Sequence, residues 1–412
     1  MPAPSIERIS RICEMLDHPE LTYPSIHITG TNGKTTTAHM ATALACAHGL
    51  PAGTFVSPHV VTVTERISVC GRSIGEDEFA EEYARLLPYL DAGADPAQPV
   101  TYFEALTALG YLWFADKPVS VGVFEVGMGG TWDATNLVRG DVAVICPIGL
   151  DHTAILGSTV AEIAAEKAGV VKAGKRVVVR GQRPEALNVI RSRCDEVGAA
   201  LLLEDDAFAL ASRTPAVGGQ SLSVRGARGS YGDVFLPVFG EQAARNAAAS
   251  IVACEELLAR PLDDRLVREA LAAVRVPGRM EVAARHPLVL LDGAHNADAM
   301  TALVATLRES FTWQRLHAVV GMFGDKDVEA VCRILAPLVD AGYAGMTGSP
   351  RAAPAERVAA ALADAGGRDV RRFGSIGKAA TAAVADAGED DLILVTGSFY
   401  TVADARPMFV SA

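Results

Sequence analysis

The fold is decided by residues 28–37, which read ITGTNGKTTT. The apolar run at 25–28 is typical of a short buried strand, and the run at 35–47, rich in Ala, Thr and Leu, is typical of a helix. A strand, a tight glycine turn and a helix N-terminus form an anion site, because backbone N–H groups converge there and the helix dipole adds positive potential. The stretch therefore predicts a phosphate-binding loop.

The side chains of this loop suit a nucleotide. Gly30 and Gly33 let the backbone approach an anion closely. Lys34 is placed to reach the β- and γ-phosphates, and the Thr35 hydroxyl to touch Mg²⁺. The spacing is more compact than G-x-x-x-x-G-K-[ST], since Ile28 stands where that pattern has its first glycine. A glycine-rich turn with a solvated lysine is the alternative, but the flanking strand and helix favour nucleotide binding.

Composition narrows the class of protein. A chain of 412 residues predicts two domains, and a net charge of −12 argues against a nucleic-acid partner. No run of about 18 uncharged apolar residues predicts a membrane span. The first 16 residues lack the apolar core of a secretory signal and resemble an amphipathic helix. Seven cysteines without a CxxC pair predict reduced, mostly buried thiols in a cytoplasmic protein.

Strand-like and helix-like runs alternate along most of the chain, which predicts a mostly parallel sheet covered by helices. We expect strands at 119–126, 141–148, 176–179 and 200–203, and helices at 73–89, 103–115, 159–172 and 184–197. Gly- and Ser-rich alternation at 211–239 predicts a small antiparallel hairpin. The predicted fold is α/β: a P-loop mononucleotide-binding domain over residues 1–278, followed by a smaller, Rossmann-like α/β domain over 279–412.

Two polar turns of the first predicted domain follow apolar strands. Glu125 ends one strand and is followed by Gly-x-Gly-Gly and Asp133, while Asp151 and His152 follow the next strand. A carboxylate at the carboxyl end of a parallel strand points into the ligand crevice of such sheets, and Mg²⁺ prefers hard oxygen donors. Glu125 is therefore a candidate Mg²⁺ ligand, and His152 is a candidate ligand of the same cation. An exposed strand-end Glu and a surface His are the alternatives.

Two further polar turns lie in the second predicted domain, LDGAHN at 291–296 and VTGSFY at 395–400. Asp292 and His295 in the first turn, and Ser398 and Tyr400 in the second, are candidate site residues facing the first domain. Capping of the helices that follow is the alternative. A nucleotide site and a second polar set together fit an ATP-driven reaction of two substrates.

A series of motifs carries a family resemblance. In order they are GTNGKTTT, SPHVVTVTERI, TYFEALTALG, FEVGMGGTWDATN, DHTAILGSTVAEIAAEKAGVVKAG, PGRME, LDGAHN, GMFGDKD and VTGSFY. From about residue 5 onward the chain resembles the folylpolyglutamate synthase/dihydrofolate synthase family of the Mur ligase superfamily. The motifs are specific as a set, whereas the P-loop alone is shared with the relatives of that family.

The resemblance implies ATP and Mg²⁺ as cofactors, with two metal sites. It implies ATP contacts from Gly30, Thr31, Asn32, Gly33, Lys34, Thr35, Thr36, Asn246, Arg279 and Asp292, and Mg²⁺ ligands Ser57, Glu125 and His152. Lys167 resembles a lysine that is carbamylated in the family; an ordinary helix-surface lysine is the alternative. The expected catalytic set consists of Lys34, Lys167 and His295.

The resemblance also implies substrates. Thr101, Phe103 and Asp133 resemble the pterin-binding set, His59 lies where some relatives carry an aromatic residue, and Tyr400 lies near the folate. His295 and Ser398 resemble glutamate-binding residues. The expected activity joins L-glutamate to dihydropteroate and to tetrahydrofolate species through an acyl phosphate, in a monomer by analogy. A monofunctional synthase, an amide ligase for a non-folate acid and a nucleotide-switched P-loop protein are the alternatives.

Overall fold

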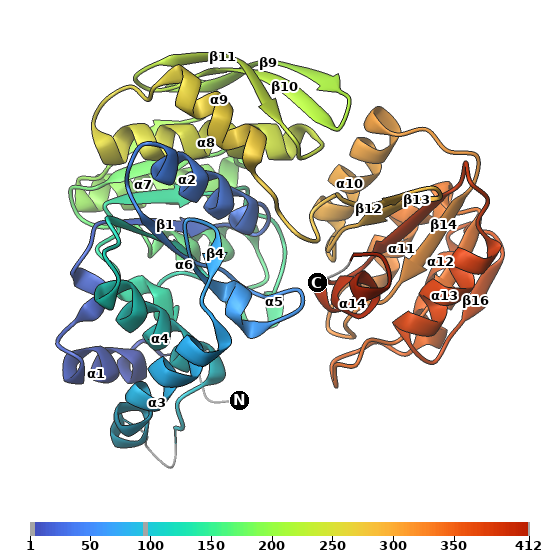
Figure 1. Cartoon of the computed structure of the whole chain (residues 1–412), viewed down its shortest axis with the longest axis horizontal. Coiled ribbons are helices and arrows are strands. Elements are labelled where there is room, and N and C mark those ends of the chain that lie inside the picture. Colours follow the sequence, from blue (N-terminus) through green and yellow to red (C-terminus); the bar gives the residue numbers. More distant parts are fainter. Residues whose placement is uncertain (1–4, 94–97, 411–412) are drawn as a thin grey trace. The chain divides into compact units, whose positions relative to one another are not determined.

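A computed structural model describes residues 5–93 and 98–410 of the chain. The chain divides into two compact units. The larger unit comprises Met1–Pro237 and Ala243–Val274, and the smaller unit comprises Val238–Gln242 and Arg275–Ala412. Both are built from sheets and covering helices, so the predicted α/β class is confirmed (Figure 1).

The larger unit is organised around an eight-stranded sheet with the order β4-β3-β2-β5-β1-β6-β7-β8. Its strands are β1 (Ser25–Thr29), β2 (Ala52–Phe55), β3 (Ile67–Val69), β4 (Arg72–Ser73), β5 (Val121–Glu125), β6 (Val142–Ile145), β7 (Arg176–Val179) and β8 (Ala200–Leu203). The six strands from β2 to β8 run parallel, and β3 and β4 add an antiparallel edge. Strand β1 is central and buried at every residue, as its apolar sequence predicts.

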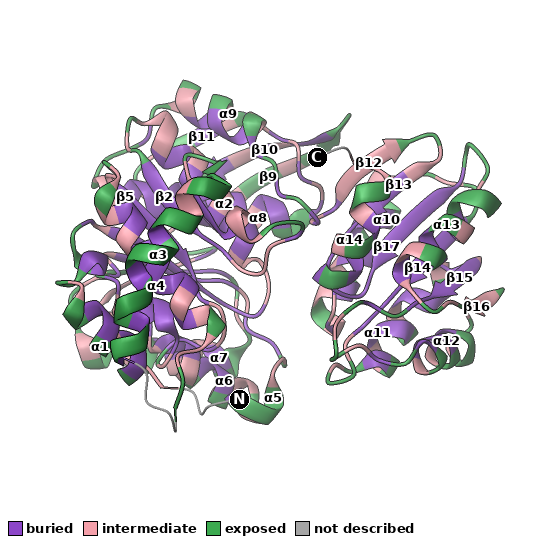
Figure 2. Cartoon of the chain, turned by 60° about the horizontal axis from the view of Figure 1, so that its bottom comes forward, coloured by how far each residue is buried: buried purple, intermediate pink, exposed green. Residues whose placement is uncertain are grey.

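Helices cover both faces of this sheet (Figure 2). They are α1 (Glu7–Met15), α2 (Lys34–Ala47), α3 (Glu76–Gly93), α4 (Tyr102–Asp116), α5 (Thr153–Leu156), α6 (Val160–Ala168), α7 (Pro184–Val197), α8 (Glu241–Leu258) and α9 (Asp264–Ala273). Helix α2 packs on β1, β2 and β5. An aromatic cluster, in which Tyr111 and Phe114 of α4 contact Phe124 of β5, anchors α4 and carries α1 and α3. The core therefore holds α2 and α4 against the central strands of the sheet.

The segment predicted as a hairpin is a three-stranded antiparallel sheet, so that prediction is wrong by one strand. It consists of β9 (Ala209–Ala216), β10 (Gly219–Arg225) and β11 (Ser230–Leu236), in the order β11-β10-β9. The Gly-rich composition of residues 226–229 is equally typical of an irregular loop and of a tight turn. These residues reverse the chain, because Glu255 of α8 accepts hydrogen bonds from the N–H groups of Ala227 (2.7 Å) and Arg228 (3.1 Å).

The prediction that the cysteines are reduced is also wrong for one pair. Cys46, near the end of α2, forms a disulfide with Cys70, which lies at the turn between β3 and β4. The two residues are 24 positions apart, so no local spacing motif signals the bond. Five free cysteines, at positions 13, 146, 194, 254 and 332, are buried as expected.

The smaller unit has a six-stranded sheet with the order β12-β13-β17-β14-β15-β16, parallel except for β12. Its strands are β12 (Glu281–Arg285), β13 (Leu288–Leu291), β14 (Leu316–Val320), β15 (Ala341–Ala344), β16 (Val370–Arg372) and β17 (Leu392–Thr396). Its helices are α10 (Ala297–Ser310), α11 (Val328–Leu335), α12 (Ala355–Asp364), α13 (Ile376–Asp386) and α14 (Phe399–Ala405). Aliphatic side chains of these elements form its core.

Short 3-10 helices complete the structure: η1 (Pro19–Leu21), η2 (Val63–Arg66), η3 (Ala134–Leu137), η4 (Ala336–Leu338) and η5 (Arg406–Met408). Across the described ranges, none of the helices combines the length and apolar character needed to cross a bilayer.

Candidate active site

The predicted phosphate-binding loop joins β1 to α2 at the centre of the larger unit. Gly33 is the N-cap of α2 and has a φ of 93°, in the left-handed region that favours glycine. A Cβ placed on Gly30 would lie 2.6 Å from Cβ of Cys146, so the loop backbone rests directly on the residue after β6. Both glycines are therefore required by geometry, and the loop leads into the N-terminus of a 14-residue helix.

Lys34 folds back over this loop. Its Nζ donates hydrogen bonds to the carbonyl oxygens of Gly30 (3.1 Å) and Thr31 (3.3 Å). An ammonium group is thus held over the backbone that would surround a phosphate chain. The arrangement is that of an anion site, because the cation and the helix N-terminus act on the same position.

Three predicted metal-site oxygen donors meet beside the loop. The Thr35 hydroxyl donates to Oε1 of Glu125 (3.0 Å), and the N–H of Ser57 donates to Oε2 of the same carboxylate (3.2 Å). Glu125 is buried. Glu125 ends β5, whereas Thr35 and Ser57 follow β1 and β2, the two parallel neighbours of β5, so all three lie at one edge of the sheet. A buried carboxylate beside the Thr35 hydroxyl fits Mg²⁺, which takes hard oxygen ligands.

His152 comes from the loop after β6, on the other side of β1. It is the N-cap of α5 with a φ of 52°, and its Nε2 lies 4.0 Å from a carboxylate oxygen of Asp151. The strand order brings this loop to the same edge of the sheet as Glu125. The role of His152 as a metal ligand stays a prediction.

Lys167, on α6, is buried and not a helix-surface lysine, with 4% of its surface exposed. Burial and, to a smaller extent, the positive charge of Lys34 lower its pKa to about 7, although the charges of Asp151 and Asp133 act in the opposite direction. Near neutral pH a large fraction of this amine is therefore uncharged. An uncharged buried lysine is a nucleophile, a property that a solvated lysine does not have at this pH.

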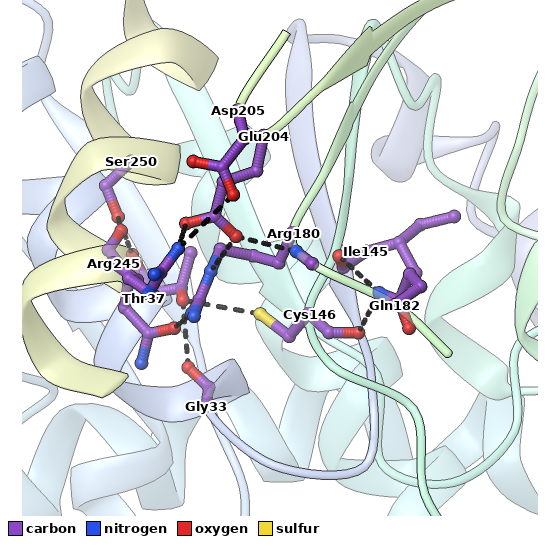
Figure 3. A network of polar contacts seen from close by, with 12 residues as sticks. Gly33, Thr37, Ile145, Cys146, Arg180, Gln182, Glu204, Asp205, Arg245 and Ser250 are labelled. Atoms are coloured by element: carbon purple, nitrogen blue, oxygen red, sulfur yellow. Dashed lines mark hydrogen bonds and ion pairs between the residues drawn. The ribbon is translucent and has the colours of Figure 1, made fainter. Parts of the chain in front are cut away.

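Asn246, on α8, reaches the same loop from a distant part of the sequence. A Cβ placed on Gly33 would lie 3.0 Å from Oδ1 and 3.1 Å from Nδ2 of Asn246, so the amide packs against the loop. Ser250 holds α8 in place, because its Oγ donates to the carbonyls of Asn246 (2.8 Å) and Thr37 (3.1 Å) (Figure 3). The structure thus brings Asn246 to the predicted nucleotide site.

A buried pair that the sequence reading missed lies behind Asn246. Arg180 follows β7 and Glu204 follows β8. Nε of Arg180 donates to Oε2 of Glu204 (3.1 Å), and Nη1 of Arg180 donates to Oδ1 of Asn246. A signal was present, since each of these charged residues ends an apolar strand at the carboxyl edge of the sheet.

Asp133 is buried and already has local partners. Its carboxylate accepts hydrogen bonds from the N–H groups of Met128 (2.9 Å) and Thr135 (3.0 Å) and from the Thr135 hydroxyl (2.5 Å). Burial raises its pKa, against the effect of these donors. It is also the N-cap of η3. The sequence reading missed this structural role, so a pterin contact would be an addition to it.

The other residues predicted to bind the pterin surround the loops after β2 and β5. Thr101 is the N-cap of α4, and the ring of Phe103 lies so close to Gly127 that a Cβ there would be 2.5 Å away. His59 accepts a hydrogen bond at Nδ1 from Nε of Arg66 (2.9 Å). Burial and the charge of Arg66 lower the pKa of His59, which keeps the ring neutral.

In the smaller unit, the polar turn after β13 contains Asp292 and His295. The Asp292 carboxylate accepts from the N–H groups of Met280 (2.9 Å) and Ala294 (2.9 Å), and burial raises its pKa against the opposing charge of Arg279. Nδ1 of His295 donates to the carbonyl of Gly293 (3.0 Å), which fixes the ring locally.

The second polar turn follows β17, the neighbour of β13. Ser398 is the N-cap of α14 and accepts from the N–H of Thr401 (3.0 Å). Tyr400 is exposed and its ring lies 5.1 Å from that of Phe323. The guanidinium of Arg279 stacks on Phe399 at 4.1 Å. The predicted residues of this unit therefore gather at one edge of its sheet.

Comparison with known families agrees with this geometry. The Mur ligase middle domain matches residues 28–254, and the glutamate ligase domain of Mur ligases matches residues 278–399. Together the matches span most of the chain and both sets of polar turns. The chain belongs to the Mur ligase family of ATP-dependent ligases and is thus an enzyme.

Within that family, the chain is similar to dihydrofolate synthases and folylpolyglutamate synthases. A dihydrofolate synthase/folylpolyglutamate synthase of Mycobacterium tuberculosis is 38% identical, over 98% of this chain and 90% of the relative. The structure of the M. tuberculosis folylpolyglutamate synthase complexed with ADP and AMPPCP superposes with a TM-score of 0.95, at 38% identity, covering 98% of this chain and 95% of the other.

Two further solved structures carry informative ligands. E. coli FolC in complex with DHPP and ADP has a TM-score of 0.86 at 32% identity, covering 97% of this chain and 91% of the other. A bifunctional folylpolyglutamate synthase/dihydrofolate synthase with Mn, AMPPNP and L-glutamate bound has a TM-score of 0.85 at 33% identity, covering 98% and 93%. Both resemble the present chain along nearly its whole length.

Proposed function

We propose that this enzyme joins L-glutamate to dihydropteroate and to reduced folates, with ATP converting the acceptor carboxylate into an acyl phosphate. The observation that carries the proposal is the meeting of Lys34, Thr35 and Glu125 at the predicted phosphate-binding loop, where the charge of Lys34 also acts on the buried amine of Lys167. The ligands of the related structures, nucleotide, Mn, DHPP and L-glutamate, support it.

The larger unit would hold the nucleotide. Gly30, Thr31, Asn32, Gly33, Lys34, Thr35 and Thr36 would surround its phosphates, with Asn246 beside them. Glu125, Ser57 and His152 would hold Mg²⁺, which supplies positive charge between two anions when bound. This charge matters because a substrate carboxylate must approach the γ-phosphate, and like charges repel.

Lys167 would carry a carbamate. Its pKa of about 7 leaves enough uncharged amine to attack CO₂, forming an N–C bond and releasing one proton. The product is an anion in place of a cation, suited to a second Mg²⁺. Burial at this position therefore favours the neutral, reactive form of the amine, and Mg²⁺ would offset the charge of the carbamate.

The reaction would proceed in two displacements. The acceptor carboxylate attacks the γ-phosphate, a new P–O bond forms, and ADP leaves. The α-amine of glutamate then attacks the acyl carbon, phosphate leaves, and the amine loses a proton. We assign His295 and Ser398 to glutamate, Tyr400 to the folate, and Arg279 and Asp292 to the nucleotide. Thr101, Phe103, Asp133 and His59 would bind the pterin end of the acceptor.

The decisive experiment measures phosphate release with ATP, Mg²⁺, L-glutamate and dihydropteroate, each omitted in turn, and identifies the product by mass. We expect turnover that requires all four. A parallel reaction with tetrahydrofolate in place of dihydropteroate tests the second activity. Use of one acceptor alone would favour a monofunctional synthase, and ATP turnover without glutamate transfer would contradict the proposal. We also expect a monomer in the cytoplasm, which sedimentation and cell fractionation test.

A further inference from the structure

The proposed reaction gives the buried residue Arg180 no role. Arg180 nevertheless forms a hydrogen bond with Asn246, which the proposal places beside the nucleotide. Arg180 and the carboxylate of Glu204 are almost fully enclosed, with 2% and 1% of their side chains exposed. Removing such a pair from water is costly, and apolar side chains of similar volume often serve stability equally well. The pair therefore calls for an explanation other than stability.

Glu204 fixes the plane of the Arg180 guanidinium. Its Oε2 accepts from Nε of Arg180 (3.1 Å) and from the N–H of Gly181 (2.6 Å), and its Oε1 accepts from Arg245 (3.0 Å) (Figure 3). Burial raises the pKa of Glu204, but Arg180 and the other donors outweigh that effect and hold it below its usual range. The carboxylate is therefore charged and keeps the guanidinium oriented.

The oriented guanidinium in turn fixes the amide of Asn246. Its Nη1 donates to Oδ1 of Asn246, and a guanidinium has donors but no acceptor. The amide must therefore present its oxygen to Arg180, since the flipped amide would set one donor against another. The NH₂ group of the fixed amide also lies at the predicted phosphate-binding loop, with Nδ2 3.1 Å from the position of a Cβ placed on Gly33.

We propose that Arg180 is a positioning residue for nucleotide binding, which selects the amide orientation that offers N–H donors to the nucleotide. The inference rests on the proposed place of Asn246 beside the nucleotide. An unfixed amide would present its oxygen to a polyanion part of the time, and the bound state would lose a hydrogen bond to a charged group.

The test is a double-mutant cycle on ADP affinity, measured by calorimetry with the full chain and Mg²⁺. We expect Arg180→Met and Asn246→Ala each to weaken ADP binding about tenfold, as loss of one such hydrogen bond would. The double variant should bind ADP as weakly as Asn246→Ala alone, because Arg180 acts through the amide. Multiplied effects, or wild-type affinity in Arg180→Met, would overturn the proposal.

Two further variants separate positioning from folding. Asn246→Asp still accepts from Arg180 but offers no donor, so it should keep the melting temperature and yet bind ADP more weakly than Asn246→Ala. Arg245→Met removes another partner of Glu204 while leaving the Arg180–Asn246 bond, and should bind ADP as the wild type does. If Arg180→Met is unstable, Arg180→Lys retains the charge beside Glu204 and should weaken ADP binding equally.

ADP binding is measured without any acceptor or glutamate. If the variants change ADP affinity as expected but the wild-type enzyme joins no glutamate, the proposed reaction is contradicted and the role of Arg180 stands. Normal ligase activity with an additive cycle would do the reverse.

Discussion

The two units hold their candidate residues in different ways. In the larger unit, Glu125, Lys167 and Asn246 are buried and are set among residues far away in the sequence, such as Thr35 and Arg180. In the smaller unit, His295 and Ser398 form hydrogen bonds with positions two or three residues away.

The two arrangements differ in how strongly they indicate a functional role. A polar residue that bonds its own turn is explained by helix capping, whether or not it also binds a ligand. A charged residue buried against a distant strand has no such local explanation, because its burial costs free energy that capping does not return. Function is therefore better supported by structure in the larger unit, and the predictions below test that contrast.

The largest effect is expected for Lys34→Ala. Loss of the ammonium over the loop should lower the rate of ADP formation by about 10³-fold, since positive charge is what lets two anions meet. Coupled-enzyme detection of ADP, with dihydropteroate and glutamate present, measures it. The exposed Lys378→Ala is the matched control and should retain full activity. ADP release at the wild-type rate in Lys34→Ala would remove this residue from the mechanism.

Lys167 is expected to give the next largest effect, with a characteristic pH dependence. Lys167→Arg keeps a cation but cannot form a carbamate, and should lower turnover about 10²-fold. In the wild type, protonation as the pH falls through about 7 removes the reactive amine, so activity should fall on the acidic side and recover with bicarbonate. Labelling with ¹³C-bicarbonate and NMR detects the carbamate. A signal retained in Lys167→Arg would assign it elsewhere.

Asp133 tests whether a residue with a local structural role also binds substrate. Asp133→Asn keeps one oxygen acceptor for the N-cap of η3 but loses the charge and the acceptor of the Met128 N–H, so stability should fall by about 1–2 kcal/mol. We expect the KM for dihydropteroate to rise about tenfold, more than that for tetrahydrofolate. Equal changes for both acceptors would leave Asp133 with capping alone.

The smallest effect is expected at Ser398 of the smaller unit. Ser398→Ala removes the N-cap of α14 and should destabilise the protein by about 1 kcal/mol. Ser398→Asp restores a cap but places an anion at the turn, so it should recover stability while raising the KM for glutamate. Thermal unfolding and glutamate titration separate the two. An unchanged KM in Ser398→Asp would show that capping explains this turn completely.

Local patterns could be predicted well from the sequence. Strand β1, the loop and α2 follow from a ten-residue stretch, and β7, β8 and α7 have the predicted bounds, because Gly and Pro residues mark their ends. The oxygen set around Glu125 follows from the rule that parallel strands end at one edge.

What the sequence did not predict depends on long-range pairing. The Cys46–Cys70 disulfide and the Arg180–Glu204 pair need three-dimensional proximity that no local spacing encodes. The third strand of the small sheet was missed because its turn is stabilised by Glu255, a residue of a later helix.

The contact between Gly30 and Cys146 has a consequence for natural variation in this enzyme. The predicted phosphate-binding loop lies directly on Cys146, the residue after β6, and leaves no room for a side chain on Gly30. The contact involves Cβ and backbone atoms of Cys146, which alanine and every larger residue share, so exchanging the residue at position 146 would not create that room. Position 30 is therefore restricted to glycine by the neighbouring strand, whether or not a ligand is bound.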